Sequence, residues 1–345
     1  MNLKQLAICT GLMALLGGAA FVAREAEAPG GRMTAAADRF LASLDGPQKK
    51  KATFDFDNKE RLRWFFTPQQ TGRKYTRKGI PLEDMTDKQR ELAMNLIRTG
   101  TSESGYKKVA TVISLESILA ELEAKKGAMV RDPLWYFVTI FGTPSKTGKW
   151  GWRIEGHHLS LNFTLEGGQV VSATPFFLGA NPAEVKAGKH KGTIALPESI
   201  TPYKELLAAL DDDQRKAARQ PDLFKEIDEN IPQWKFVEPV GLSAAKLTEA
   251  QQKLLWRLIE GYAGRMPAEI AAFELAAIKK AGLDKVTFAF SEFPKKPGAP
   301  YKYRVQGPTF VIELINEQSD SAGNPANHIH SAWRRINGDF GLVTR

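Results

Sequence analysis

Thiols are almost absent from this chain of 345 residues, in which Cys9 is the single cysteine. Cys9 lies inside an apolar amino-terminal stretch that we expect to be removed on export, so we expect the mature chain to contain no thiol. A chain without thiols has no disulfide bonds, no zinc–thiolate sites and no cysteine nucleophile. The sequence also lacks a Gly-x-Ser-x-Gly motif, and no Gly-x-Gly-x-x-Gly opens an expected helix. These absences remove the usual signatures of serine hydrolases and of dinucleotide binding.

The amino terminus has the pattern of a secretory signal. Lys4 supplies a positive start, and residues 6–22 are apolar and rich in Ala, Gly and Leu. We therefore expect residues 1–28 to be a signal peptide, residues 29–36 to be a tether, and the protein to be secreted or periplasmic. An uncleaved helix that anchors the chain in the membrane is the alternative, because the apolar run is barely long enough to span a bilayer. Beyond this segment we expect no integral membrane domain.

Charge is abundant but not concentrated. The net charge is +9, and 25% charged beside 43% hydrophobic residues is typical of a globular protein. The lysines occur in pairs and triples, such as those at 49–51 and 107–108, which are separated by acidic residues. No helix-turn-helix, zinc-knuckle or aromatic–basic RNA-binding pattern accompanies them. We expect solvated charged faces and no nucleic-acid partner.

Several patterns occur twice in the same order, which indicates an internal duplication. The segments that begin at Leu44 and Leu210 both read Leu-Asp-x-x-Gln and continue with basic residues. Thr86 and Thr248 each precede a helical pattern, and we expect both to be helix N-caps. An aromatic strand pair follows each time, first in tryptophan-rich and then in tyrosine-rich form.

Each repeat therefore reads as helices followed by an antiparallel hairpin. This order predicts an α+β fold with pseudo-twofold symmetry, in which the two repeats share or pair their sheets because one strand pair alone is not a stable layer. We place the first repeat at residues 37–178, a connecting loop at 179–199 and the second repeat at 200–345.

Histidine is scarce, yet four of the five histidines occur in two short motifs. One motif is Trp150-Gly-Trp-Arg-Ile-Glu-Gly-His-His-Leu-Ser-Leu-Asn162, and the other is Asn327-His-Ile-His-Ser-Ala-Trp-Arg334. Such clustering predicts one site assembled from two distant strands.

Strand alternation decides which side chains of these motifs can cooperate. If residues 152–164 form one strand, His158, Ser160 and Asn162 share one face with Ile154, while His157 lies on the other face. A single bulge would exchange His157 and His158.

The second motif favours a metal site, because His-x-His on a strand presents two imidazoles on one side. We expect His158, His328 and His330, with His157 as the substitute for His158, to bind a divalent transition metal such as zinc, iron, copper or manganese. Two alternatives stay open. One is a metal-free acid–base or ligand pocket, and the other is a purely structural role in which the histidines hydrogen-bond backbone at the sheet edge.

Further candidate residues follow from the same faces. In the second repeat Glu313 takes the place of Asn162, and we expect it to be a fourth ligand or a general base, with Ser160 as a second candidate catalytic residue. Asn162 would orient the substrate and Arg334 would clamp an anionic group, although Arg334 could equally pair with Asp339.

Aromatic residues complete the expected binding site. Trp152 and Trp333 are candidate substrate-binding residues, which would stack on a small-molecule or saccharide ligand. The residues together favour a metal-dependent hydrolase acting on a small polar or carbohydrate-like substrate. A non-catalytic envelope protein that binds a ligand in the same pocket is the alternative.

Four sequence runs together resemble one known family. They are Trp150–Asn162, Pro175-x-Phe-x-Gly-Ala-Asn-Pro-Ala183, Gly307-Pro-Thr-x-x-Ile-Glu313 and Asn327–Arg334. They resemble a secreted bacterial family catalogued as domain of unknown function 3500, and the likeness covers nearly all of the chain from about Arg39 onward. The resemblance implies that the two histidine motifs belong together, but it brings no established activity, fold or cofactor.

Overall fold

The computed structural model describes residues 28–124, 129–292 and 299–342. In this part of the chain, helices pack against one large mixed sheet, so the predicted α+β class is confirmed. The predicted signal peptide lies outside the described residues except for Ala28. Within the described ranges, no helix combines the length and the apolar character needed to cross a membrane.

Strands from both halves of the chain build the central sheet. The first half contributes β5 (Phe137–Phe141), β6 (Lys149–Gly156), β7 (Leu159–Glu166) and β9 (Phe176–Ala180). The second half contributes β11 (Thr287–Glu292), β12 (Tyr301–Gln306), β13 (Phe310–Gln318) and β14 (His328–Arg335). Hydrogen-bonded neighbours follow the order β5-β6-β7-β9-β14-β13-β12-β11. The antiparallel strands β9 and β14 therefore meet in the middle, with Phe176 opposite Trp333.

Short strands complete the edges of the sheet. β1 (Thr53–Phe54) and β4 (Ile80–Pro81) pair with β5, β8 (Gln169–Ser172) pairs with β7, and β10 (Leu242–Ser243) pairs with β11. A separate small hairpin is formed by β2 (Gln70–Thr71) and β3 (Lys74–Tyr75).

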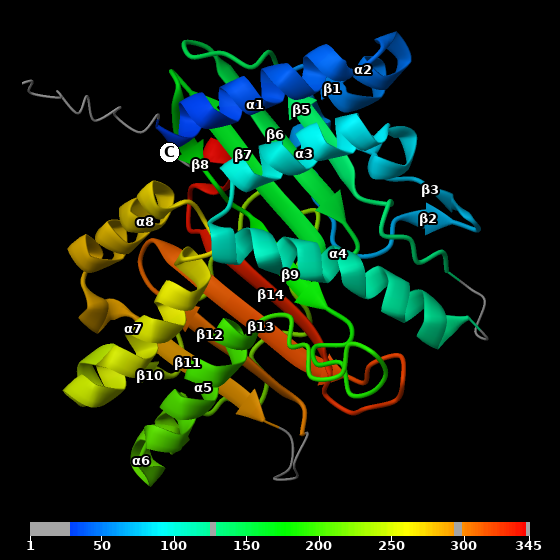
Figure 1. The fold of residues 1–345 in the computed structure, drawn as a ribbon. Helices are drawn as coiled ribbons and strands as arrows, with labels where there is room; N and C mark the ends of the chain where they lie inside the picture. Colours follow the sequence, from blue (N-terminus) through cyan, green and yellow to red (C-terminus); the bar gives the residue numbers. More distant parts are fainter. Residues whose placement is uncertain (1–27, 125–128, 293–298, 343–345) are drawn as a thin grey trace, which may run out of the picture.

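The longer helices cover one face of the sheet (Figure 1). Over the first half lie α1 (Pro29–Ser43), α3 (Asp87–Thr99) and α4 (Glu103–Glu123), and over the second lie α5 (Pro197–Ala209), α7 (Glu249–Ala263) and α8 (Ala268–Ala281). Two short helices are α2 (Gly46–Ala52) and α6 (Asp212–Ala218). Single 3₁₀ turns are η1 (Lys59–Leu62), η2 (Leu82–Asp84), η3 (Ala244–Lys246), η4 (Leu283–Lys285) and η5 (Asp339–Gly341).

Side-chain caps fix where several helices begin. The hydroxyl of Thr86 accepts a hydrogen bond from the backbone N–H of Gln89 at the start of α3, and Thr248 accepts one from Gln251 at the start of α7. Both predicted N-caps are therefore confirmed. Each glutamine side chain accepts in return from the backbone N–H of its threonine, which completes a capping box. Asp211 caps α6 in the same way.

The two faces of the sheet are covered differently. Buried side chains such as Ile154 and Trp333 face the helices. The opposite face, called the loop face below, is covered by residues 55–79 and 219–241, which bond to sheet side chains through backbone carbonyls such as that of Val237. A second apolar cluster forms there from Trp64, Phe66, Phe177, Ile227, Ala332 and Phe340.

Buried ion pairs also line the loop face. The pairs are Arg77–Glu155, Arg153–Glu60, Arg304–Glu313 and Arg334–Asp339. Charges buried in this way need partners, because removal from water costs several kcal/mol for each unpaired ion. The pairs that join loop to sheet therefore hold the loops in place.

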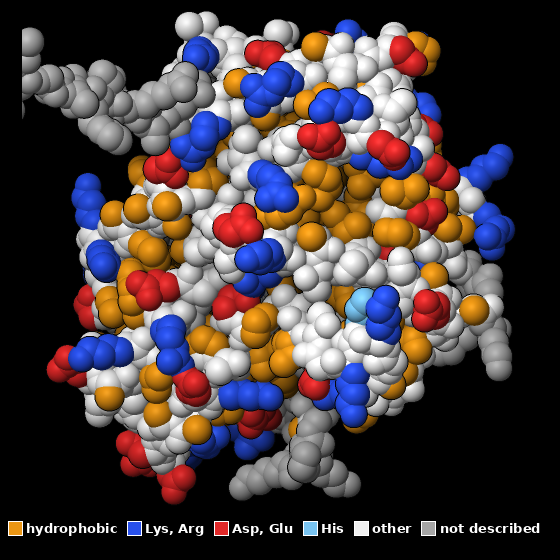
Figure 2. Space-filling model, viewed as in Figure 1, with side chains coloured by type: hydrophobic (Ala, Val, Ile, Leu, Met, Phe, Trp, Pro, Cys, Tyr) orange, Lys and Arg blue, Asp and Glu red, His pale blue; other side chains and the backbone are white. Residues whose placement is uncertain are grey.

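The helix-covered face carries mixed charge. Figure 2 shows Lys and Arg side chains interspersed with Asp and Glu on this face, with hydrophobic side chains between them. On this face the arrangement agrees with the expected solvated charges.

Residues 29–36, predicted as a tether, are instead the first part of α1, which begins at Pro29. Met33 is fully buried. A Cβ on Gly30 would lie 2.0 Å from the backbone oxygen of Gly168, so the small residues here permit close packing of α1 on the turn between β7 and β8. The connection between the halves is also shorter than predicted, because β9 extends to Ala180 and α5 begins at Pro197.

Candidate metal centre

The first histidine motif forms a hairpin, so the expectation of one continuous strand was wrong. β6 ends at Gly156, β7 begins at Leu159, and His157 and His158 form the turn between them. His158 has a positive φ of 60°, as is common in tight hairpin turns.

In the sequence the turn appears as a change in the phase of the alternation, because apolar residues occupy even positions up to Ile154 and odd positions from Leu159 onward. In the hairpin Asn162 lies opposite Arg153, and Ile154 lies opposite Leu161. Asn162 therefore shares a face with Arg153 and not with Ile154.

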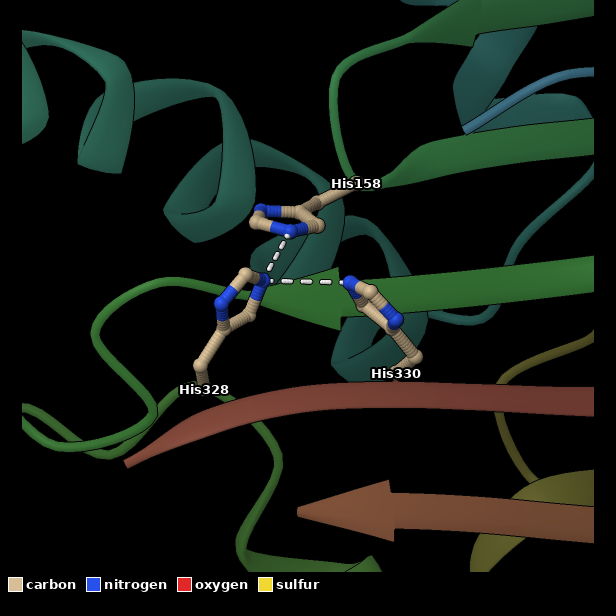
Figure 3. A group of neighbouring side chains, drawn as sticks. All are labelled: His158, His328 and His330. Carbon is tan, nitrogen blue, oxygen red and sulfur yellow. Dashed lines mark hydrogen bonds between the residues drawn. The ribbon is translucent and has the colours of Figure 1, made fainter. Parts of the chain in front are cut away.

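Three imidazoles from the two motifs converge at this end of the sheet (Figure 3). His328 and His330 project from the same side of β14, and the turn places His158 over them. The Nε2 atoms of His158 and His328 lie 2.8 Å apart, and those of His328 and His330 lie 3.1 Å apart. The three ligand atoms all lie within 4.8 Å of one another, so this group, called the histidine triad below, could hold a metal ion.

The spacing is close to what a metal requires. Nitrogen ligands on a tetrahedral zinc ion, with bonds of about 2.0–2.1 Å, lie about 3.3 Å from one another. Small rotations of the rings would bring the triad around one ion.

Hydrogen bonding alone satisfies the triad poorly. Nδ1 of His330 lies 3.0 Å from Oε2 of Glu226, so this nitrogen donates its hydrogen to the carboxylate and Nε2 keeps the lone pair. Nε2 of His328 would then have to donate one hydrogen to both His158 and His330. A cation at the centre would instead be bound by three lone pairs.

Burial favours the neutral form of His158 and His328. His158 is 4% exposed and His330 is 7% exposed, while His328 is half-buried. Burial lowers the pKa of His158 well below its usual value, and the neighbouring histidines lower it further. Burial, followed by the effect of His330, lowers the pKa of His328 to about 2. Neutral imidazole is the form that binds a metal.

Backbone contacts seat His158 in its position. Its N–H donates to the carbonyl of Phe66 at 2.8 Å, and its carbonyl accepts from the N–H of Gly179 at 2.8 Å. A Cβ on Gly179 would lie 2.9 Å from Cδ2 of His158 and 2.8 Å from the carbonyl oxygen of Ile329. Glycine is therefore required at position 179 for the close approach of the ring.

His157, the substitute ligand in our prediction, points to a different set of partners. Its Nδ1 lies 2.5 Å from Oε1 of Glu116 on α4 and 3.3 Å from Nη1 of Arg131. Its ring stacks on that of His158, with centroids 3.8 Å apart. His158 is therefore the member of the pair that joins the triad, and the ring of His157 packs against that of His158.

The predicted catalytic residues make their contacts elsewhere on the loop face. Oε1 of Glu313 accepts hydrogen bonds from Arg304, at 2.9 Å from Nε and 2.6 Å from Nη2. Ser160 is fully buried, and its Oγ accepts from Nδ2 of Asn162 at 3.2 Å. Nδ2 of Asn162 also donates to the carbonyl of Pro175 at 3.0 Å. None of these contacts involves a triad histidine, so the roles predicted for the three residues stay predictions.

The other predicted substrate-binding residues are buried as well. Arg334 donates to Oδ2 of Asp339 at 2.8 Å, which is the alternative considered from the sequence. Trp152 stacks on Phe163 and Trp333 stacks on Phe310, and each tryptophan is 1% exposed. As placed here, neither indole offers a surface on which a ligand could stack.

Three residues that contact the histidines were missed by the sequence reasoning. Glu226 and Glu116 stand in a loop and on a helix, and no spacing relates them to the histidine motifs. Gly179 was predicted only as the first residue of the connecting loop, because a sequence does not show that another chain segment approaches its Cα.

Comparison with known protein families matches residues 26–342 to the family described as "Protein of unknown function (DUF3500)". The match covers nearly the whole chain, so the chain belongs to this family, and the resemblance found in the motifs is confirmed. No curated protein matches the chain. No solved structure matches it.

Proposed function

For this member of a family of unknown function, we propose that the histidine triad binds one divalent transition metal ion and that the protein is a metal-dependent hydrolase. The observation that carries the proposal is the convergence of three Nε2 atoms from His158, His328 and His330. Zinc, iron, copper and manganese all accept imidazole nitrogen, and zinc is the simplest candidate for three neutral histidines.

Three protein ligands leave a coordination position open, which is the arrangement of catalytic and not of structural zinc sites. An ion held there by His158, His328 and His330 would supply the activation of water that hydrolysis near neutral pH requires. The carboxylate of Glu226 supports this chemistry, because its bond to Nδ1 of His330 orients the ring and raises its basicity.

The substrate proposed for this centre is a small polar or carbohydrate-like molecule. His158 and His330 are almost fully buried, and His328 is the half-buried member of the triad. This burial favours a small molecule or a chain end over a bulky ligand.

The metal content of residues 29–345, purified without chelator and without an affinity histidine tag, tests the proposal. We expect about one metal ion per chain in the wild-type protein and none in the double variant His328→Ala/His330→Ala. His190 lies exposed in the loop between β9 and α5, so His190→Ala is the matched control. Absence of metal from the wild-type protein after reloading with each of the four metals would overturn the proposal. Hydrolysis of small ester and glycoside substrates by the loaded protein then separates an enzyme from a metal-binding protein.

We further propose that the chain is an internal duplication with pseudo-twofold symmetry. Support comes from matching bonds in both halves. The side chains of Gln48 and Gln89 bond to each other between α2 and α3, and those of Gln214 and Gln251 do so between α6 and α7. The strand order also reads alike from both edges of the sheet to the β9–β14 pair. Separate expression of the halves tests the proposal, which predicts that they associate in a one-to-one complex.

Export is also part of the proposal. It is supported by Lys4 and by the apolar residues 6–22 that follow it. Fractionation of cells that produce the full chain tests it. Recovery of a product that still contains residues 1–28 in the cytoplasm alone would contradict it.

A further inference from the structure

We propose that Glu116 is a positioning residue, which holds His157 and thereby sets the place of His158 in the histidine triad. The inference rests on the proposed metal site. It concerns Glu116 and His157, which contact each other, and the stacking of the His157 ring on that of His158, not the three converging nitrogens.

Glu116 is a buried carboxylate whose bond to the hairpin turn is short. Its side chain is 5% exposed, and its Oε1 lies 2.5 Å from Nδ1 of His157. A carboxylate on a helix interior stays buried only with such a partner, since an unpaired buried charge costs several kcal/mol. The bond therefore fixes the His157 ring against α4.

The position of His157 determines that of His158, because the two residues form one turn. Their rings stack with centroids 3.8 Å apart, and the hydroxyl of Tyr136 donates to the carbonyl of His157 at 2.9 Å. With His157 held from both sides, the peptide that leads to His158 has little freedom. This restraint matters because positive φ values are unfavourable for residues with a side chain.

The same helix also holds the segment that leads into His328. Glu123 lies seven residues after Glu116, two turns further along the same side of α4. Its carboxylate accepts from Nε of Arg131 at 2.8 Å and from Oγ of Ser321 at 2.6 Å. Ser321 belongs to the loop between β13 and β14. One helix therefore restrains both chain segments that supply the triad.

Two readouts on Glu116→Leu test the inference, with Glu121→Leu on the exposed side of α4 as the matched control. Leucine removes the acceptor but keeps a similar volume. In the metal-free protein we expect at least tenfold faster hydrogen exchange at the amides of His158 and Gly179, which are bonded in the wild type. In the metal-loaded protein we expect the Kd for Co²⁺ to rise about 10- to 100-fold, with a changed visible absorption band. Glu116→Gln keeps an acceptor and should restore most of the affinity.

Unchanged exchange at the turn together with an unchanged Kd for Co²⁺ in Glu116→Leu would overturn the inference. A wild-type protein that binds neither Co²⁺ nor Zn²⁺ would overturn the proposed function alone, because the exchange readout needs no metal. If Glu116→Leu does not fold, the same readouts apply to Glu116→Met, which also lacks the acceptor but has an unbranched side chain. No change in either readout in Glu116→Met would overturn the inference.

Discussion

The hairpins β6–β7 and β12–β13 have the same architecture but different turns. In both, an arginine lies opposite a polar residue of the next strand, Arg153 opposite Asn162 and Arg304 opposite Glu313. The first hairpin turns through two histidines, whereas the second turns through residues 307–309, which contain none. The strands therefore provide a common scaffold, and of the two turns only the first supplies a histidine to the triad.

The arginines illustrate how the strand faces are used. Arg304 pairs directly with Glu313, while Arg153 pairs with Glu60 from the loop that covers the sheet. Both arrangements place paired charges in the interior. A turn side chain is not confined to one face, so His158 can reach past β9 to the histidines of β14 (Figure 3).

The largest expected effect is on stability, at the polar pair of the second hairpin. Glu313→Gln should lower the free energy of unfolding by about 3–5 kcal/mol, because it leaves the buried Arg304 without its carboxylate. Chemical denaturation measures this change. Glu249→Gln, at an exposed pair with Lys253, should change stability by less than about 1 kcal/mol. Metal content should stay unchanged, and loss of metal from Glu313→Gln would support the ligand role first predicted for this residue.

The second-largest expected effect is on zinc affinity, when His158 in the turn is replaced. His158→Thr puts into the first turn the residue type that Thr309 provides in the second. We expect at least a 100-fold rise in the Kd for zinc, since loss of a direct ligand should exceed the roughly 10- to 100-fold effect of an outer-shell residue. Titration against a competing chelator measures it, with Thr309→Ser as the control. Equal zinc affinity in His158→Thr and wild type would remove His158 from the site.

A smaller effect is expected where β9 passes beneath the turn. Gly179→Ala adds a Cβ within 3 Å of the His158 ring and of the Ile329 carbonyl, so the ring must shift. The Kd for zinc should rise about tenfold, which is about 1.4 kcal/mol. Gly46→Ala is the control, because a Cβ there meets no atom within 4 Å. An unchanged Kd would show that the triad tolerates movement of the turn.

The smallest expected effect is a pH dependence of stability that arises on β12 and has no counterpart on β6. Burial raises the pKa of Tyr301 on β12 to about 12, while β6 carries Trp150 and Trp152, whose side chains do not titrate. A folded pKa above the ordinary value of about 10 means that the contribution of Tyr301 to stability is complete below pH 10 and is lost between about pH 10 and 12. Burial also raises the pKa of other tyrosines such as Tyr203 and Tyr303, so both proteins lose stability at high pH. At pH 11 the wild-type protein should lose about 1 kcal/mol more than Tyr301→Phe. Denaturation of both proteins at pH 9 and pH 11 provides the measurement. Equal losses in the two proteins would contradict the prediction.

Local sequence was sufficient for much of the fold. The caps Thr86 and Thr248 were correct because a capping box involves only residues three apart. The turn at His157 and His158 was missed because one strand was assumed across the point where the apolar residues change from even to odd positions. Residues 29–36 were misjudged because small residues serve flexible segments and close helix packing alike.

For the candidate site, the sequence by itself determined which imidazoles are available and that they form two motifs. Only the tertiary structure decided that His158 and not His157 joins His328 and His330. It also placed Arg334 and the two tryptophans in the interior, away from a ligand. The physical reason is that local patterns report the side of an element on which a residue lies. The identity of the neighbour on that side depends on pairing between strands more than a hundred residues apart, such as β9 and β14.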